Sequence, residues 1–337
     1  MSFLLELLKK LFGWGTNTPD PSPDPVPAPV VDDPTEPAEI TTNRVLLIIY
    51  NPIMDSDTGE KLSQRTGWQD PDKLVVGFSA EITEDSYGMA RYEIVERIEV
   101  DGFPTLEDGF RYSPSLYLDV IERRTPPHQP DKVDYYAIFE QFNIAERVNQ
   151  NEIDEVWIFA FPYGGFYESR MAGKDAFWCN APALKNTDHI TRKFITMGFS
   201  YERDIGEMLE SFNHRVESHM ERTFRNLKGS KDLWEHFTRY DKQNPGQAEM
   251  GNVHFAPNSE RDYDWGNPKF VPSNCYDWYN FPNFTGDTRQ VNASEWGNGD
   301  IRLHHRWWLK HIPHVAGRKN GVHNNWWQYI LNPNKID

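Results

Sequence analysis

Hydrophobic and polar residues repeat along this chain with two different periods, and the periods predict the order of its elements. Arg44–Tyr50 and Glu155–Pro162 are nearly continuous apolar runs, which are typical of strands buried on both faces. Tyr92–Val100 alternates apolar and polar residues, as a half-exposed strand does. We expect two further strands, at Lys73–Ile82 and at Lys193–Phe199.

Other stretches carry helical spacing. Residues 132–148 and 202–228 place apolar side chains three or four positions apart, and the second range has the longest such stripe. Shorter helices are expected at 231–240, 301–311 and 325–331. Strand, helix and strand follow one another, and this order predicts an α/β fold with a parallel or mixed sheet and flanking helices.

The first 40 residues differ from this pattern. Within residues 1–15, positions 2–14 carry one apolar stripe of leucines and Phe12, which predicts an amphipathic helix. About three turns are too few for a stable isolated helix, so we expect it to anchor or dock on a membrane surface or a protein partner. Residues 16–40 hold eight of the chain's 24 prolines and six acidic residues, which favours an extended spacer. A frayed terminus is the alternative, and residues 41–337 are expected to form one domain.

Composition narrows the classes of partner. The formal net charge of −16 repels phosphates, so no nucleic-acid partner is expected. No run of about 18 apolar residues occurs, so we expect no transmembrane helix. Charged residues interrupt the first apolar stretch instead of preceding it, which argues against a signal peptide and leaves peripheral attachment to a membrane as one expectation.

The last hundred residues have an unusual composition. Residues 244–337 contain seven of the 12 tryptophans and six of the 11 histidines, in a sequence rich in Asn, Gly and Pro. So many aromatic residues in irregular chain predict an aromatic-rich C-terminal segment that wraps over the α/β core.

The long helix of residues 202–228 carries the first candidate site. Acidic residues and His214 recur every three or four positions from Glu207 to Glu221, so they share one face. Carboxylates and an imidazole on one face suit a divalent metal such as zinc. We expect His214 and His254 to bind this metal and Glu210 and Glu217 to act in catalysis. The alternative is a solvated face opposite the apolar stripe.

Two other groups of residues carry weaker signals. An acidic residue followed closely by Trp and Asn recurs around Trp265, Trp278 and Trp296. Such units can bind sugars through ring stacking and hydroxyl contacts, or they can cap turns and fill the core. Two cysteines, Cys179 and Cys275, exclude a disulfide scaffold. Cys179 is more typical of a small buried hydrophobic residue than of a nucleophile.

Four stretches of the chain between Glu155 and Pro333 are distinctive: EVWIFAFPYGGFYESRMAG, GFSYERDIGEMLESFNHRVES, NVHFAPNSERDYDWGNP and HHRWWLKHIPHVAGRKNGVHNNWW. On these stretches the chain resembles an uncharacterised family of bacterial proteins. The resemblance implies one shared domain that includes the Trp-rich end, and it implies no activity.

The sequence supports three hypotheses for function. The first is a metal-assisted hydrolase whose site lies between the helix of residues 202–228 and the C-terminal segment. The second is a non-catalytic carbohydrate-binding module. The third is an accessory protein that its N-terminal helix docks to a membrane or a larger assembly.

Overall fold

The computed structural model describes residues 32–337, so the expected N-terminal helix and most of the expected spacer lie outside the described residues. A five-stranded sheet has the order β4-β1-β5-β7-β6 and confirms the α/β fold. The strands β1, β4, β5 and β7 run parallel, and β6 pairs antiparallel with β7 at one edge. The sheet strands are β1 (Thr41–Tyr50), β4 (Ala90–Val100), β5 (Glu155–Ala160), β6 (Ser169–Ala172) and β7 (Phe194–Ser200).

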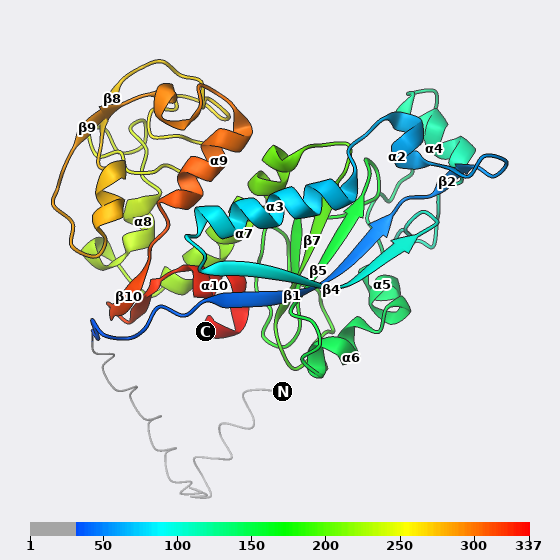
Figure 1. Cartoon of the computed structure of the whole chain (residues 1–337), viewed down its shortest axis with the longest axis horizontal. Helices are drawn as coiled ribbons and strands as arrows, with labels where there is room; N and C mark the ends of the chain where they lie inside the picture. The colour runs from blue at the N-terminus through cyan, green and yellow to red at the C-terminus, as the bar shows by residue number, and fades with distance from the viewer. Residues whose placement is uncertain (1–31) are drawn as a thin grey trace, which may run out of the picture. The chain divides into compact units, whose positions relative to one another are not determined.

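Helices cover both faces of the sheet. Figure 1 shows α3 and α7 on one face and α5 and α6 on the other. Every residue of β5 is buried, because this strand lies inside the sheet and has helices above and below it. The helices are α2 (Leu62–Thr66), α3 (Pro71–Asp85), α4 (Pro114–Ile121), α5 (Tyr135–Gln141), α6 (Ile144–Asn149), α7 (Ile205–Phe224), α8 (Leu233–Phe237), α9 (Ile301–Lys310) and α10 (Trp327–Leu331).

Three two-stranded ribbons and four short 3₁₀ helices complete the described chain. The ribbons pair β2 (Ile53–Asp55) with β3 (Glu60–Lys61), β8 (Val271–Ser273) with β9 (Arg289–Val291), and β10 (His314–Lys319) with β11 (Val322–Asn325). The 3₁₀ helices are η1 (Gly229–Lys231), η2 (Cys275–Asn280), η3 (Ala293–Trp296) and η4 (Pro333–Lys335). None of the helices within residues 32–337 has the length and apolar character needed to cross a bilayer.

Two sequence-based expectations about these elements were wrong. The strand expected at Lys73–Ile82 is helix α3, which begins with the capping residue Asp70 and with Pro71 in its first turn. The single helix expected at 132–148 is divided into α5 and α6. The division falls at Asn143, whose left-handed backbone (φ 51°) interrupts helical hydrogen bonding.

Residues 32–40, expected to belong to the spacer, pack on the β10–β11 ribbon instead. The amide of Gly317 donates to the carbonyl of Glu36 at 2.7 Å, and His323 Nε2 donates to the carbonyl of Pro37 at 2.9 Å. Arg318 also forms an ion pair with the Glu36 carboxylate at 2.6 Å. The carbonyls of this segment take part in no helix or sheet ladder, so groups of the ribbon can donate to them.

The expected aromatic-rich C-terminal segment is present, and its helix α10 packs on β1 and β4. Figure 1 shows α8, α9 and the β8–β9 ribbon gathered at one side of α3 and α7. The segment shares an aromatic core with α8, in which Phe237 of α8 packs edge to face on Trp308 and on Trp326. Its helix α9 also packs along α7, so one side of α7 faces the sheet and another faces this segment.

Glu249 gives the aromatic core of the C-terminal segment a pH dependence. Burial raises the pKa of Glu249 from 4.5 to about 7, although Trp278 Nε1 donates to its carboxylate. The folded state therefore binds this proton more tightly than the unfolded state, and stability falls as pH rises from about 4.5 through 7. We expect Glu249→Gln to match the wild type near pH 4.5 and to be more stable by about 1–3 kcal/mol at pH 8. Urea denaturation of both proteins between about pH 4.5 and pH 8 tests this expectation. A difference in the free energy of unfolding that stays the same across these pH values would contradict it.

Candidate functional site

The polar face of α7 is covered, and the cover brings the four predicted residues together. Glu210, His214 and Glu217 project from successive turns of α7, and His254 comes from the loop 251–265. The side chains of Glu210, His214 and His254 are 11%, 17% and 30% exposed. The solvated face that was the alternative is therefore not what the structure shows.

Three of these residues direct donor atoms to a common point. His214 Nε2 and His254 Nε2 are 3.1 Å apart, and Glu210 Oε1 is 3.5 Å from His254 Nε2. The three donor atoms lie within 4.8 Å of one another. Zinc ligands at about 2.0–2.1 Å in tetrahedral geometry are separated by about 3.3 Å, so the observed spacing suits a single ion.

The other ring nitrogen of each histidine contacts a carboxylate. His214 Nδ1 donates to Glu217 Oε2 at 3.0 Å, and His254 Nδ1 lies 3.0 Å from Asp262 Oδ1 as an ion-pair contact. The Nδ1 of His214 must carry the proton in its hydrogen bond, because an ionised carboxylate only accepts. Metal-binding histidines are held in this way in proteins, and the contact fixes both the tautomer and the ring orientation.

The closest contact between the two rings joins their Nε2 atoms. These atoms lie 3.1 Å apart, a distance that suits either a proton on one ring or a cation between the rings. A proton would serve these two atoms only, whereas a divalent cation would satisfy both nitrogens and the Glu210 carboxylate at once.

The pKa shifts of these groups reflect the same mutual contacts. Burial would raise the pKa of Glu210, but hydrogen bonds from His254 and Tyr263 and the charge of His214 lower it overall. Burial would lower the pKa of His214, but its contact with Glu217 raises it overall. The hydrogen bond with Glu210 is the main cause that raises the pKa of His254.

The structure changes the part that Glu217 plays. One Glu217 oxygen holds His214 Nδ1, and the other accepts the backbone N–H of Val253 at 3.0 Å. Both oxygens are therefore engaged in positioning, and Glu217 does not point a free carboxylate at the common point. Glu210, which the sequence suggested as a catalytic acid or base, supplies the third donor atom instead.

The loop that carries His254 is held by local turns. Asn252 Oδ1 accepts the backbone N–H groups of His254 and Phe255, which forms a tight turn just before the histidine. The amide of Tyr263 donates to the carbonyl of His254 at 3.1 Å. These bonds, together with the contact between Val253 and Glu217, fix His254 over α7.

Sequence reasoning missed three residues that border this cluster. Asp262 holds His254, as described above. Tyr263 Oη lies 3.1 Å from His254 Nε2, and burial together with Glu210 raises its pKa to about 12. Glu168 lies close enough that its charge contributes to raising the pKa values of both His214 and Tyr263. The repeated acidic units around Trp265 included Asp262, but no sequence signal marked Glu168.

Three other C-terminal histidines belong to the core. His304, His305 and His311 are each at most 2% exposed, and burial lowers the pKa of His304 to about 3. His305 has no hydrogen-bond partner for either ring nitrogen within the described chain, and it stacks edge to face on Trp265. The charges of His214 and His254 reinforce the effect of burial in lowering its pKa, which places His305 behind the cluster.

The other candidates from the sequence do not form open sites. Trp265, Trp278 and Trp296 are at most 5% exposed, so their faces are not available to stack on a sugar. They are buried because the C-terminal segment needs large apolar side chains to form a core. Both cysteines are free and buried, and burial raises the pKa of Cys179 to about 11, which argues against a thiolate nucleophile.

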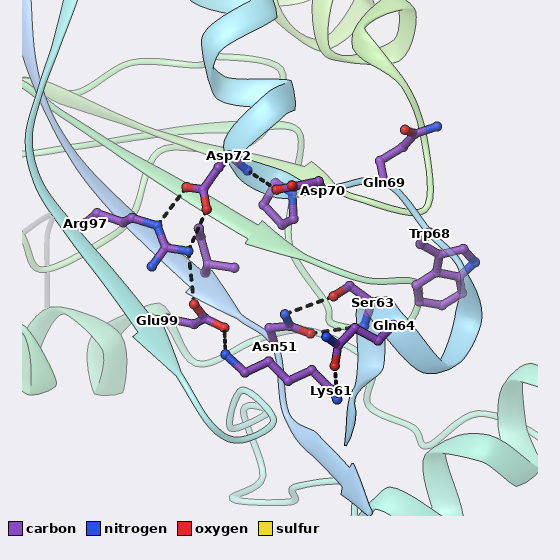
Figure 2. Close-up of a pocket in the computed structure, with 12 residues that line it drawn as sticks. Asn51, Lys61, Ser63, Gln64, Trp68, Gln69, Asp70, Asp72, Arg97 and Glu99 are labelled. Atoms are coloured by element: carbon purple, nitrogen blue, oxygen red, sulfur yellow. Dashed lines mark hydrogen bonds and ion pairs between the residues drawn. The ribbon is translucent and has the colours of Figure 1, made fainter. Parts of the chain in front are cut away.

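A separate cleft of about 380 Å³ lies at the carboxyl ends of β1 and β4. Ligands often bind at this edge of an α/β sheet. Figure 2 shows that four of its five charged side chains bind one another: Arg97 binds Asp72 and Glu99, and Lys61 binds Glu99. The cleft therefore offers a ligand fewer unpaired polar side chains than the cluster on α7.

Comparisons with protein-family models, with curated proteins and with solved structures find no match for this chain.

Proposed function

We propose that this protein is a metal-dependent hydrolase, with one divalent cation held by Glu210, His214 and His254. The observation that supports it most is that both histidines point Nε2 at one place while a carboxylate holds each Nδ1. Two histidines and one carboxylate form a catalytic rather than a closed structural zinc site, because a position is left for water or substrate. A bound cation would polarise a substrate carbonyl or phosphoryl group and acidify a coordinated water.

In this proposal the protein side chains divide the remaining work. Glu217 and Asp262 keep the two imidazoles in the tautomer that binds metal. Glu168 is the proton acceptor, since it holds no histidine ring and its one hydrogen-bonded oxygen accepts from Asn180 at 2.6 Å. Tyr263 lies at the exposed side and can donate to an oxygen that develops charge.

Metal analysis of the purified full chain tests the proposal. We expect about one zinc per chain after loading and dialysis, and loss of that zinc in His214→Ala and in His254→Ala. The matched control is His128→Ala. His128 also contacts a carboxylate, that of Asp108 at 2.7 Å, but it belongs to no group of possible metal ligands within the described residues. Equal zinc contents in the wild type and His214→Ala would refute the centre.

Catalysis is tested separately on the zinc-loaded protein. Hydrolysis of 4-nitrophenyl acetate or bis(4-nitrophenyl) phosphate should require zinc, and Glu168→Gln should keep zinc but lose about 10²–10⁴-fold in kcat. Bound zinc without hydrolysis of either compound would count against the hydrolase. Iron in place of zinc would also count against it, because two histidines and a carboxylate are the usual ligands of non-haem iron oxygenases.

Replacing Glu217 tests the positioning role directly. Glu217→Gln keeps the size of the side chain but weakens its hold on His214 Nδ1, so we expect zinc affinity to fall about 10–100-fold. Competition with a zinc-binding dye measures this change. Asp108→Asn makes the same change beside His128 and should leave zinc affinity unaltered. An unchanged affinity in Glu217→Gln would show that this carboxylate does not support the metal.

A further inference from the structure

A second hollow lies on the same face of α7, beyond the metal cluster. It has a volume of about 360 Å³ and is lined by Phe177, Trp178, Ser218, Glu221, Arg222 and Arg225. We call it the Trp178 pocket. Helix geometry places Glu210, His214, Ser218, Glu221 and Arg225 along one side of α7, because their spacings are three or four residues. Arg222 is eight residues from His214, which corresponds to about 12 Å along the helix.

Trp178 is unusual among the tryptophans of this protein. Its side chain is 60% exposed, and no other tryptophan within residues 32–337 is in the exposed class. The adjacent Cys179 is completely buried and its amide donates to the carbonyl of Ala181 at 3.1 Å, which holds the backbone next to Trp178. A large aromatic ring kept in water on a fixed backbone is typical of a surface that contacts a flat or apolar ligand.

Neither arginine of the pocket pairs with a side-chain carboxylate within the part of the chain that the structure describes. Arg225 is the more available to an anion, because its only hydrogen-bond partner in that part is the carbonyl of Arg222, to which Nη1 donates at 2.9 Å. Arg222 Nε donates at 3.0 Å to the main-chain oxygen of Asp337, the last residue described. The Arg222 guanidinium also lies over the Phe177 ring at 5.4 Å, which restricts its orientation. Glu221 is the one carboxylate side chain that lines the pocket.

The wall between the pocket and the metal cluster is continuous. The amide of Asn180 donates to Ser218 Oγ at 3.0 Å, and its side chain donates to Glu168 at 2.6 Å. Ser218 therefore borders the pocket, while Glu168 borders the cluster. A molecule of moderate size could contact both places along α7.

We infer that the Trp178 pocket binds the oxyanion end of the substrate, a carboxylate or phosphate attached to a flat or apolar group. Arg222 and Arg225 bind the oxyanion, Trp178 stacks on the adjoining group, and the bond to be cleaved lies at the metal centre. This inference rests on the proposed function where it calls the bound molecule a substrate. Anion binding by the pocket does not depend on the metal.

Binding of small naphthalene compounds to the chelator-treated full chain tests the pocket alone. We expect 2-naphthyl phosphate or 2-naphthoate to bind at least tenfold more tightly than 2-naphthol in calorimetric titrations, and the two anions distinguish phosphate from carboxylate. Arg225→Gln and Trp178→Ala should each weaken the anion about tenfold or more, consistent with loss of a charge-assisted hydrogen bond or a stacking contact. Both side chains are exposed, so the variants should remain folded.

Two further variants make the result specific to the pocket. Glu221→Gln removes the carboxylate from its lining and should strengthen anion binding about two- to fivefold, opposite in sign to Arg225→Gln. Arg203→Gln changes an arginine just before α7 whose side chain is 58% exposed, and it should have no effect. Equal binding of 2-naphthol and the anions, or unchanged binding in Arg225→Gln, would overturn the inference even if zinc is bound. Anion binding that depends on Arg225 without any bound zinc would leave the pocket standing and remove only the hydrolase.

The zinc-loaded protein then connects the pocket to catalysis. For an anionic ester that the protein hydrolyses, Arg225→Gln should raise KM about tenfold and leave kcat within about twofold, because the arginine contacts the part of the substrate that does not react. A fall in kcat with unchanged KM would contradict the assigned role.

Discussion

Glu155→Ala should destabilise the protein by about 3–5 kcal/mol, because it leaves the Arg215 guanidinium buried without its carboxylate partner. The side chains of Arg215 and Glu155 are 0% and 1% exposed, and their closest N–O distance is 2.6 Å. Arg215 also donates to the carbonyls of Ile330 and Leu331, and Glu155 accepts from Asn43. One ion pair therefore joins β1, β5, α7 and α10, and its loss should be felt across the fold.

Urea denaturation of the purified variant measures this loss. Glu60→Ala removes one partner of the Arg65–Glu60 pair, whose side chains are 48% and 34% exposed, and should cost at most about 1 kcal/mol. The double variant with Glu155→Leu and Arg215→Met removes both charges, so it should lose less stability than Glu155→Leu alone. A loss for Glu155→Ala as small as that for Glu60→Ala would show that the buried pair is not needed.

Gly251→Ala should cost about 2–4 kcal/mol and should also weaken zinc binding. Gly251 has φ +72°, a conformation that strains a residue with a side chain by about 1–3 kcal/mol. A Cβ at this position would also overlap the carbonyl oxygen of Phe255, so the backbone of the turn would have to move. This turn immediately precedes His254, and a displaced turn would move that histidine away from His214.

Gly246 provides a close control for this effect. Its φ is +74°, but a Cβ there would meet no atom within 4 Å. Gly246→Ala should therefore show only the backbone strain, about 1 kcal/mol, and should leave zinc affinity unchanged. Urea denaturation and zinc titration of the two variants separate the effect of backbone strain from that of the overlap between the new Cβ and the Phe255 carbonyl. Equal losses in both variants, with zinc binding intact, would mean that the turn before His254 tolerates a side chain.

Part of the candidate site could be predicted from the sequence. The period of an α-helix places Glu210, His214 and Glu217 on one face, and this follows from sequence spacing alone. His254 is 40 residues away, and its choice as a ligand depended on an assumed cover over that face. Spacing could not show which ring nitrogen points inward. It also could not show that Glu217 contacts a ring while Glu210 supplies the third donor atom of the group, because both depend on side-chain orientation.

Local signals explain where the secondary structure was predicted and where it was not. The apolar runs of β1 and β5 are so continuous that only a buried strand suits them at that length. The segment Lys73–Ile82 is also apolar, but its capping residue Asp70 and Pro71 mark a helix start. For residues 32–40, composition indicated a spacer. The structure instead packs this segment, which has a turn at Pro34 and Thr35, against the β10–β11 ribbon at the other end of the sequence.

The α/β class, the long amphipathic helix and the shared face of its acidic residues and His214 could be predicted from the sequence, because each depends on residues close together in the chain. The structure was needed to show that this face is covered, that Asp262, Tyr263 and Glu168 join it, and that Trp178 and two arginines extend it into a pocket. Those arrangements depend on contacts between segments far apart in the chain, and such contacts are set by packing of the whole domain and leave no periodic pattern in the sequence.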